Sequence, residues 1–174
     1  MMTPPDGQGK GLAALPSLAL RDATAADAEA LSRLHRASRF GAMPRLPELH
    51  DAHQTAAWMR ETVIARLTVR VATLAGAPAG YLALDGDLLD QLYVAPECQG
   101  VGVGTALLDE ARRLRPNGFT LWVFQRNARA RAFYDRHGLV PVEETDGAGN
   151  EEHEPDIRYA WPVDAPAIRD RGRP

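Results

Sequence analysis

The chain contains 174 residues, of which 45% are hydrophobic and 25% are charged, and this size and composition are typical of a one-domain soluble globular protein. Its formal net charge of −3 disfavours a general nucleic-acid-binding protein, which normally carries a net basic face. Because Cys98 is the only cysteine and no run of 18 apolar residues occurs, an internal disulfide, a cysteine-based metal cluster and a membrane-spanning helix are excluded. We therefore expect a cytoplasmic protein without a bound metal, a nucleic-acid partner or membrane contact.

The composition changes at both ends of the chain and predicts one domain between two tails. Residues 1–16 are rich in Gly, Pro and polar residues, and residues 163–174 are rich in Pro and Arg. Neither stretch has the apolar period of a helix or a strand, so both are expected to be flexible. The folded domain is therefore predicted to span residues 17–162.

Hydrophobic periodicity within that domain predicts strands and helices in mixed order. The first helix begins in a capping-box-like sequence at Thr24 and carries Leu34 and His35 on one face, and the second carries Trp58 and Val63 as candidate core residues. The expected strands are 18–20, 67–75, 79–84, 88–94, 119–124, 139–142 and 156–161, and the expected helices start near 24, 54, 103 and 127. This order predicts a single mixed α/β domain in which a central strand leads into a glycine-rich loop and a helix.

The glycine-rich loop, Gln99-Gly100-Val101-Gly102-Val103-Gly104-Thr105, is a candidate anion site. Backbone N–H groups at a helix N-terminus have no partner within the helix and carry the positive end of its dipole. Glycines remove the Cβ atoms that would keep a phosphate away, so the loop fits a pyrophosphate. Tight packing alone also accounts for many such turns.

Two common nucleotide loops do not fit this segment. A dinucleotide-binding loop would have a third glycine at position 105, where this chain has Thr105, and an acidic residue after the next strand. A nucleoside-triphosphate loop would have Gly-Lys-Ser/Thr, and the loop contains no lysine. An NAD-binding or nucleotide-binding domain is therefore disfavoured.

Two sequence blocks carry a more specific signal. Residues 92–108 read Leu-Tyr-Val-Ala-Pro-Glu-Cys-Gln-Gly-Val-Gly-Val-Gly-Thr-Ala-Leu-Leu, and residues 127–139 read Asn-Ala-Arg-Ala-Arg-Ala-Phe-Tyr-Asp-Arg-His-Gly-Leu. The first resembles the Gln/Arg-x-x-Gly-x-Gly/Ala motif of the GCN5-related N-acetyltransferase (GNAT) superfamily, which follows a strand ending in Val-x-Pro. The second is similar to that family's Asn-x-x-Ala-x-x-Phe-Tyr-x-x-x-Gly-Phe block, with Leu139 in place of Phe. The resemblance covers roughly residues 18–161.

This resemblance implies a fold, a cosubstrate and a set of site residues. The fold would be the acyl-CoA N-acyltransferase fold, with a mostly antiparallel central sheet flanked by helices, and the cosubstrate would be acetyl-CoA without a metal. Tyr134 would act as general acid at the sulfur, and Asn127 would bind the pantetheine arm. Main-chain groups would bind the rest of the cosubstrate: the pantetheine at Leu92, Tyr93 and Val94, and the pyrophosphate at Gln99, Gly100, Val101, Gly102, Val103, Gly104 and Thr105.

The reaction that the resemblance implies needs a neutral amine. A lysine-like ammonium with a pKa near 10.4 is neutral only about one part in 2,500 at pH 7, a deficit of roughly 4.6 kcal/mol. Many relatives place a glutamate base on the strand before the loop or on the next one. Here the first strand offers Asp90 and Gln91, and the second carries Trp122 and Phe124. Asp90 is therefore the first candidate for the base, and the assignment stays open.

The acceptor site is expected on the variable half of the domain. The early loop and helix that wall it in relatives contain Glu48, His50 and His53 here, and Trp122 is a candidate floor of the pocket. Residues 143–156 contain seven acids and no Lys or Arg, so Glu152 and Asp156 are candidate contacts of a cationic amine. The same acids also fit a solvated hairpin tip.

The sequence thus favours an N-acetyltransferase that transfers an acetyl group from acetyl-CoA to a primary amine of a small molecule or peptide. By resemblance, the amine attacks directly in a ternary complex, and a homodimer is plausible by the same analogy. The alternative is a non-catalytic acyl-CoA-binding or sensor module, since the usual strand glutamate is missing.

Overall fold

The computed structural model describes residues 17–162, and the two predicted tails, 1–16 and 163–174, lie outside the described residues. Within residues 17–162, seven strands and four α-helices follow one another in the predicted order. In chain order they are β1 (Leu18–Asp22), α1 (Ala28–Ala42), α2 (Ala52–Trp58), β2 (Thr68–Leu74), β3 (Ala77–Asp85), β4 (Leu88–Val94), α3 (Val103–Leu114), β5 (Phe119–Phe124), α4 (Ala128–Arg136), β6 (Val140–Thr145) and β7 (Asp156–Trp161). Short 3-10 helices, Ala25–Asp27 and Pro96–Cys98, precede α1 and the glycine loop.

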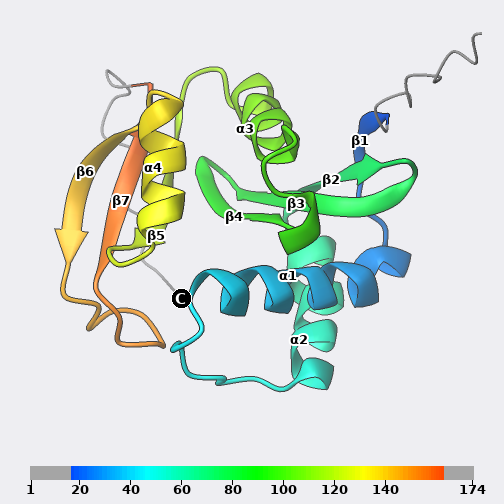
Figure 1. The fold of residues 1–174 in the computed structure, drawn as a ribbon, viewed down its shortest axis with the longest axis horizontal. Coiled ribbons are helices and arrows are strands. Elements are labelled where there is room, and N and C mark those ends of the chain that lie inside the picture. Colours follow the sequence, from blue (N-terminus) through cyan, green and yellow to red (C-terminus); the bar gives the residue numbers. More distant parts are fainter. Residues whose placement is uncertain (1–16, 163–174) are drawn as a thin grey trace, which may run out of the picture.

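All seven strands form one sheet in the order β1-β2-β3-β4-β5-β7-β6. Neighbouring strands are antiparallel except β4 and β5, which are parallel. Within residues 17–162, the pair Leu88 and Thr120 is the one register pair that joins β4 to β5, whereas β5 and β7 pair along their whole length. The two halves of the sheet therefore diverge beyond that pair (Figure 1). The predicted mostly antiparallel sheet is confirmed.

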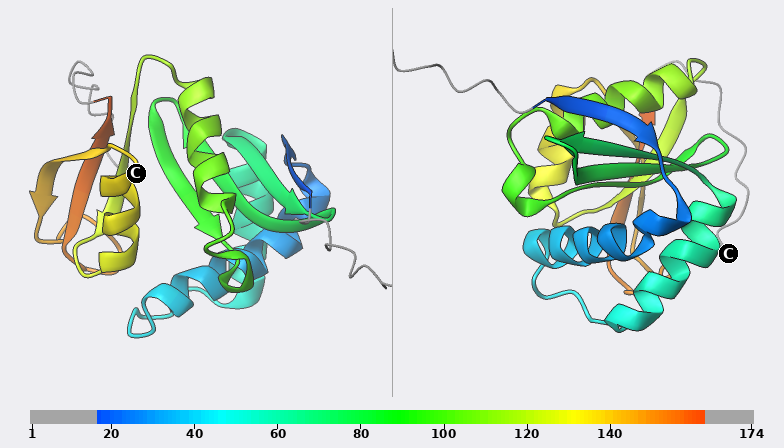
Figure 2. Two further views of the ribbon diagram at one scale, coloured as in Figure 1. Left: turned by 45° about the horizontal axis from the view of Figure 1, so that its top comes forward. Right: turned by 90° about the vertical axis from the view of Figure 1, so that its right-hand side faces the viewer.

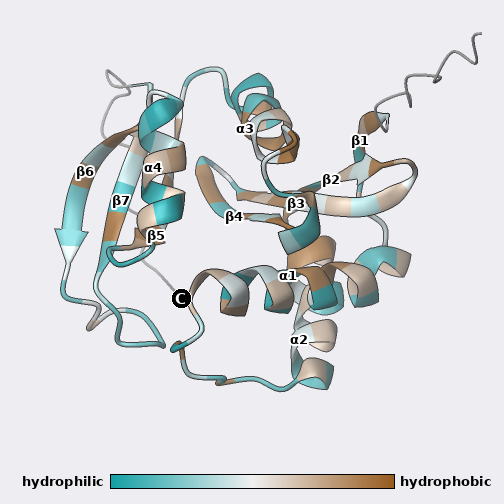
Figure 3. Cartoon of the chain, viewed as in Figure 1, coloured by the Kyte–Doolittle hydropathy of each residue, from teal (hydrophilic) through white to brown (hydrophobic). Residues whose placement is uncertain are grey.

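Helices cover both faces of the sheet, α3 and α4 on one and α1 and α2 on the other (Figure 2). This arrangement explains why β3 is buried along nearly its whole length, since successive side chains of a strand point to opposite faces. Leu82 and Leu84 pack in the core beneath α3, and Tyr81 and Ala83 pack in the core beneath α1. The connection between β6 and β7, in contrast, is hydrophilic (Figure 3).

The second predicted helix differs from the structure in two respects. It begins at Ala52, earlier than the expected 54, because the Asp51 carboxylate accepts a hydrogen bond from the Gln54 amide at 2.8 Å and caps it. Its second half, Met59–Ile64, is a π-helix. Val63 is fully buried as predicted, but the prediction that Trp58 is a core residue is wrong. Trp58 is 38% exposed because it lines an open cavity beside α1.

Among the described residues, no helix is both long enough and apolar enough to cross a bilayer.

Candidate active site

A β-bulge in β4 determines which side chains reach the point where the sheet opens. Ala83 of β3 pairs with Gln91 and Leu84 pairs with Leu89, so Asp90 is the extra residue between them. The Asp90 side chain is exposed at this irregularity, while Gln91 is 5% exposed. The bulge thus leaves Asp90 in contact with solvent while Gln91 is buried, and the two side chains still meet, since Gln91 Nε2 donates to Asp90 Oδ2 at 3.1 Å.

Two neighbouring cavities share Arg39 and Glu152 in their lining, and the first lies between the diverging strands β4 and β5. This strand cavity has a volume of about 200 Å³ and is lined by side chains of β4, β5, α4 and the β6–β7 connection. Its lining residues are Arg39, Leu89, Asp90, Gln91, Leu92, Tyr93, Leu121, Trp122, Val123, Phe124, Asn127, Ala130, Tyr134, Asn150, Glu152 and Asp156. It brings together the predicted Asp90, Leu92, Tyr93, Trp122, Asn127, Tyr134, Glu152 and Asp156, but not Val94.

Tyr134 of α4 lies at the wall of the strand cavity with 8% of its surface exposed. Its ring packs against those of Phe133 and Tyr159, which hold it in place. Burial, and secondarily the nearby Tyr93, raise the pKa of the Tyr134 hydroxyl above its ordinary value. The hydroxyl therefore keeps its proton at neutral pH and can donate it into the cavity.

Asn127 caps α4 beside Tyr134. Its side-chain oxygen accepts a hydrogen bond from the Ala130 amide at 3.1 Å, which fixes the orientation of the side chain. The two N–H bonds of the same amide group are thereby left for the strand cavity, which Asn127 lines. The Asn127 side chain can therefore donate a hydrogen bond to a carbonyl group of a ligand in the strand cavity.

The glycine loop leads into α3 without a side-chain cap. Gly102 is the N-cap residue with φ of 96°, a conformation that favours glycine, and a Cβ at this position would meet open space. The first-turn N–H groups of α3 therefore have neither a side-chain acceptor nor an intrahelical partner. The Gln99 side chain does not face this end; its amide donates to the Val94 carbonyl at 3.2 Å and ties the loop to β4.

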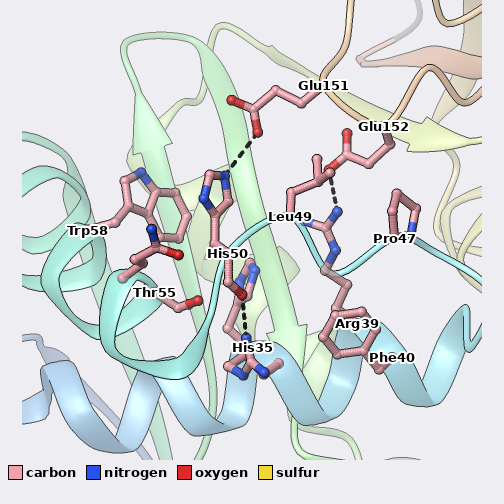
Figure 4. Close-up of a pocket in the computed structure, with 12 residues that line it drawn as sticks. His35, Arg39, Phe40, Pro47, Leu49, His50, Thr55, Trp58, Glu151 and Glu152 are labelled. Atoms are coloured by element: carbon pink, nitrogen blue, oxygen red, sulfur yellow. Dashed lines mark hydrogen bonds and ion pairs between the residues drawn. The ribbon is translucent and has the colours of Figure 1, made fainter.

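The second cavity, which we call the helix cavity, lies between α1, α2, the loop joining them and the β6–β7 connection (Figure 4). Its volume is about 420 Å³. Its lining residues are His35, Arg36, Arg39, Phe40, Pro47, Leu49, His50, Gln54, Thr55, Trp58, Glu151 and Glu152. The predicted His50 and Glu152 lie here, whereas Glu48 pairs with Arg36 and His53 lines neither cavity.

Ion pairs join the two sides of the helix cavity. Arg39 of α1 pairs with Glu152, and His50 Nε2 lies 3.3 Å from a Glu151 carboxylate oxygen (Figure 4). Arg39 and Glu152 line both cavities, so their ion pair lies where the two meet. Glu152, one of the two acids predicted to contact a cationic amine, is therefore already paired with a basic side chain of the protein.

Asp156, the other predicted acid, is held inside the protein. It is 1% exposed, and its carboxylate accepts hydrogen bonds from Thr145 Oγ1 at 2.5 Å and from Asn150 Nδ2 at 3.1 Å. These bonds join β6, β7 and the connection between them. The structure thus gives Asp156 a role in shaping the loop that carries Glu151 and Glu152.

Sequence reasoning missed the three basic residues of α1 that line the helix cavity. His35, Arg36 and Arg39 occupy neighbouring positions on one helical face, which a helical-wheel reading of the first helix could have grouped. Burial, reinforced by Arg39 and Arg36, lowers the pKa of His35 to about 4, so its ring is neutral at physiological pH.

Comparisons with known proteins agree with this architecture. A family model described as an acetyltransferase (GNAT) domain matches residues 63–140. The peptidyl-lysine N-acetyltransferase YjaB of Salmonella typhimurium is 36% identical over 62 residues, which is 36% of this chain and 42% of that protein. Its counterpart from Escherichia coli is 34% identical over 62 residues, which is again 36% of this chain and 42% of that protein. The chain thus matches less than half the length of these curated relatives.

Solved structures extend the likeness to nearly the whole described fold. Apo YjaB from Escherichia coli superposes with a TM-score of 0.71 at 21% identity, over 83% of this chain and 97% of that one. The PaiA N-acetyltransferase of Thermoplasma acidophilum in complex with coenzyme A superposes with a TM-score of 0.61 at 22% identity, over 82% of this chain and 98% of that one. YncA of Salmonella typhimurium with acetyl-CoA, called a putative acetyltransferase, superposes with a TM-score of 0.61 at 21% identity, over 89% of this chain and 99% of that one.

The matched segment, residues 63–140, includes the glycine loop as well as Asn127 and Tyr134, and the last two line the strand cavity. The fold agrees over a much longer stretch than the sequence does. Residues 63–140 are thus similar to a GNAT acetyltransferase domain, and the described fold is similar to that of solved N-acetyltransferases.

Proposed function

We propose that the protein is an acetyl-CoA-dependent N-acetyltransferase that acetylates a primary amine of a small molecule or peptide by direct attack in a ternary complex. The observation that carries this proposal is the strand cavity, where a protonated tyrosine and the donor groups of Asn127 face the parted strands β4 and β5. The likeness of the fold to structures that contain coenzyme A or acetyl-CoA supports the cosubstrate.

The glycine loop and β4 would hold the cosubstrate in two different ways. The first-turn N–H groups of α3 suit the pyrophosphate, because they combine unpaired donors with the positive end of the helix dipole. The edge of β4 that faces β5 offers main-chain groups to the amides of the pantetheine arm, and Asn127 offers its side-chain N–H groups. The thioester would then lie near Tyr134.

The chemical step would proceed by attack of the neutral amine nitrogen on the thioester carbonyl. A carbon–nitrogen bond forms, the carbon–sulfur bond breaks, and the Tyr134 hydroxyl gives its proton to the departing sulfur. The ammonium would first lose one proton to Asp90, directly or through water, since Asp90 is the exposed carboxylate at the bulge of β4. The second proton, which the nitrogen loses after the carbon–nitrogen bond forms, would pass through water to restore the Tyr134 hydroxyl. Glu152, at the junction of the two cavities, would attract the ammonium form before it loses its first proton.

Ligand-dependent melting tests the proposal first. A ligand present at 100 times its Kd adds about 2.7 kcal/mol to the stability of the folded state. We expect acetyl-CoA and CoA to raise the Tm by roughly 5–10 °C, and NAD and ATP at the same concentration to leave it unchanged. Thiol release from acetyl-CoA in the presence of primary amines then measures turnover. Absence of a Tm shift with either CoA species would remove the basis of the proposal.

The same two measurements separate an enzyme from an acyl-CoA sensor. Saturable acetyl-CoA binding without thiol release across alkylamines, diamines and lysine peptides would favour the sensor. The position of Tyr134 at the wall of the strand cavity favours the enzyme, because a leaving thiolate needs a proton donor there.

A further inference from the structure

A chain of four polar side chains crosses the core from the helix cavity to the strand cavity. His35 Nδ1 lies 2.9 Å from the Tyr81 hydroxyl, Tyr81 donates to Gln91 Oε1, and Gln91 Nε2 donates to Asp90 Oδ2 at 3.1 Å. His35, Tyr81 and Gln91 are 7%, 0% and 5% exposed. Hydrogen bonds this deeply buried are costly to leave unmade, so the chain has one preferred arrangement of protons.

The carboxylate at one end sets the direction of every bond. An Asp90 carboxylate oxygen accepts from Gln91, so Gln91 turns its NH₂ group toward Asp90 and its oxygen toward Tyr81. Tyr81 has a single hydroxyl proton and gives it to that oxygen. At the other contact Tyr81 must therefore accept, and the proton between it and the imidazole belongs to His35 Nδ1.

This assignment leaves the second ring nitrogen of His35 as an acceptor. The ring lines the helix cavity, and among residues 17–162 its Nε2 has no hydrogen-bond partner. The Trp58 ring meets the His35 ring edge-on with 5.6 Å between the ring centroids, and the Tyr93 ring packs against it with 4.5 Å between the centroids. Because the pKa of His35 is lowered to about 4, the ring stays neutral and keeps this lone pair at physiological pH.

We propose that His35 Nε2 determines acceptor specificity by accepting a hydrogen bond from an N–H group of the acceptor that is distant from the reacting amine. The distance follows from the position of Tyr93, whose ring packs on His35 and also lines the strand cavity, where acetyl transfer is proposed to occur. Suitable acceptors carry a second N–H donor, either a peptide amide or a second amine. This inference rests on the proposed acetyltransferase function.

The tautomer can be observed directly in the protein without any substrate. Long-range ¹H–¹⁵N correlation spectra of the imidazole, assigned with a His35→Gln variant, are expected to show a protonated Nδ1 and an unprotonated Nε2 from pH 6 to 8. A protonated Nε2 in this range would overturn the assignment.

Two substitutions at Gln91 then test the direction of the hydrogen bonds: one is expected to reverse the bond between Tyr81 and His35, and the other is expected to keep it. In Gln91→Met, Tyr81 loses its acceptor and is expected to donate to His35 Nδ1, so the ring proton moves to Nε2 and the cavity gains a donor in place of an acceptor. Gln91→Glu keeps an oxygen for Tyr81 in either protonation state and is expected to preserve the wild-type tautomer. The spectra of both variants check this before any kinetics.

The functional test compares three amines of similar length: 1,5-diaminopentane, Nα-acetyl-lysine methylamide and pentylamine. Only the first two carry a distant N–H donor, and they represent the second-amine and peptide-amide sources of it. We expect Gln91→Met to raise KM for one or both of them at least tenfold more than it raises KM for pentylamine, and to exceed the effect of Gln91→Glu. Equal changes for all three amines would overturn the proposal.

Binding to the same probes separates this inference from the proposed function. A probe with a distant N–H is expected to move the His35 Nε2 resonance, whether or not thiol is released. Thiol release with an unmoved resonance would retain the enzyme and overturn the role of His35. A moved resonance without thiol release would retain the binding role and remove the proposed acetyltransferase. An unmoved resonance with every probe would overturn the role of His35.

Discussion

Arg39 donates a hydrogen bond to Glu152 across 113 residues of sequence, and the two side chains line both cavities. Their exposed fractions, 23% for Arg39 and 11% for Glu152, place the ion pair where solvent screens it only in part. In the proposed reaction, a cationic amine that moves from the helix cavity toward the thioester would compete with Arg39 for Glu152. The pair would then couple substrate entry to the packing of α1 against the β6–β7 connection.

We expect Glu152→Gln to weaken the binding of a cationic amine by removing the charge that attracts it. KM for the amine is expected to rise about tenfold, equivalent to roughly 1.4 kcal/mol, while the Kd for acetyl-CoA stays unchanged. Steady-state kinetics at low and at high ionic strength measure this, because salt reduces the wild-type advantage. Glu144→Gln, which changes an exposed acid on β6, is the matched control. A similar KM change in both variants would assign the effect to net charge.

Replacing Tyr134 by Phe should slow the chemical step. The hydroxyl is the proposed proton donor to sulfur, and loss of a general acid commonly costs about 10²–10⁴ in rate. We expect kcat to fall about 100-fold with the Kd for acetyl-CoA within twofold, measured by thiol release and by melting. Tyr159→Phe removes another buried hydroxyl, from a ring 5.9 Å away, and should retain turnover. Full activity of Tyr134→Phe would refute the acid role.

The pH dependence of the same reaction follows from the direction of the Tyr134 pKa. An acid whose pKa is raised stays protonated over a wider range, so its loss cannot limit the rate at or below the ordinary tyrosine pKa of about 10. We expect kcat, measured with saturating amine, to show no fall between pH 7 and pH 9. A descending limb in this range that Tyr134→Phe abolishes would show that the pKa of the hydroxyl is lowered below the ordinary value and would contradict the assigned direction.

A Cβ at Gly102 should weaken CoA binding more than it weakens the fold. Gly102 has φ of 96° and Gly76, in the turn between β2 and β3, has φ of 83°, and neither position has an atom within 4 Å of an added Cβ. Alanine at each site should therefore cost a similar ~1–2 kcal/mol of stability. We expect only Gly102→Ala to raise the Kd for CoA, by about tenfold or more. Equal affinities in the two variants would mean that the loop does not bind the pyrophosphate.

The capping box before α1 makes a pH-dependent contribution to stability. Hydrogen bonds from Arg21 chiefly, and from Thr24, lower the pKa of Asp27 to about 2, below the value of about 3.9 in the unfolded chain. Since the folded pKa is the lower one, the stabilisation is present above pH 4 and is lost as the pH falls toward 2.

We expect Asp27→Asn to destabilise the protein by about 1 kcal/mol at pH 7, which is typical of a weakened capping-box hydrogen bond to a carboxylate. The difference from wild type should shrink as the pH falls from 4 to 2. Denaturant unfolding of both proteins at several pH values gives the comparison, with Asp51→Asn, at the cap of α2, as a second capping site. A difference that grows as the pH falls would contradict the assigned direction.

Local patterns carried enough information to predict most elements, because their causes lie within a few residues. The bounds predicted for the strand at 88–94 are those of β4, and the Thr24 capping box is present. The glycine-rich loop leads into a helix as predicted, and Gly102 is the N-cap residue of that helix. Each of these features depends on side chains that are neighbours in sequence.

Features set by distant contacts escaped prediction for the same reason. The bulge at Asp90 depends on how β4 pairs with Ala83 and Leu84 of β3, and the partner of Arg39 lies 113 residues away. Trp58 has the spacing of a core residue, but an open cavity lies on that side of α2. Hydrophobic spacing reports which face of a helix is apolar and does not report whether that face is covered.

The single register pair between β4 and β5 also has a consequence for self-association. Unpaired strand edges on the outside of a protein invite pairing with other chains, and natural proteins shorten, charge or cover them. Here the unpaired stretches of β4 and β5 lie in the middle of the sheet, between β3 and β7, with α3 and α4 over one face. A narrow extended molecule fits between two such strands, whereas the edge of a folded domain does not. The fold thus keeps free backbone donors and acceptors for a ligand without offering them to the edge strand of another copy.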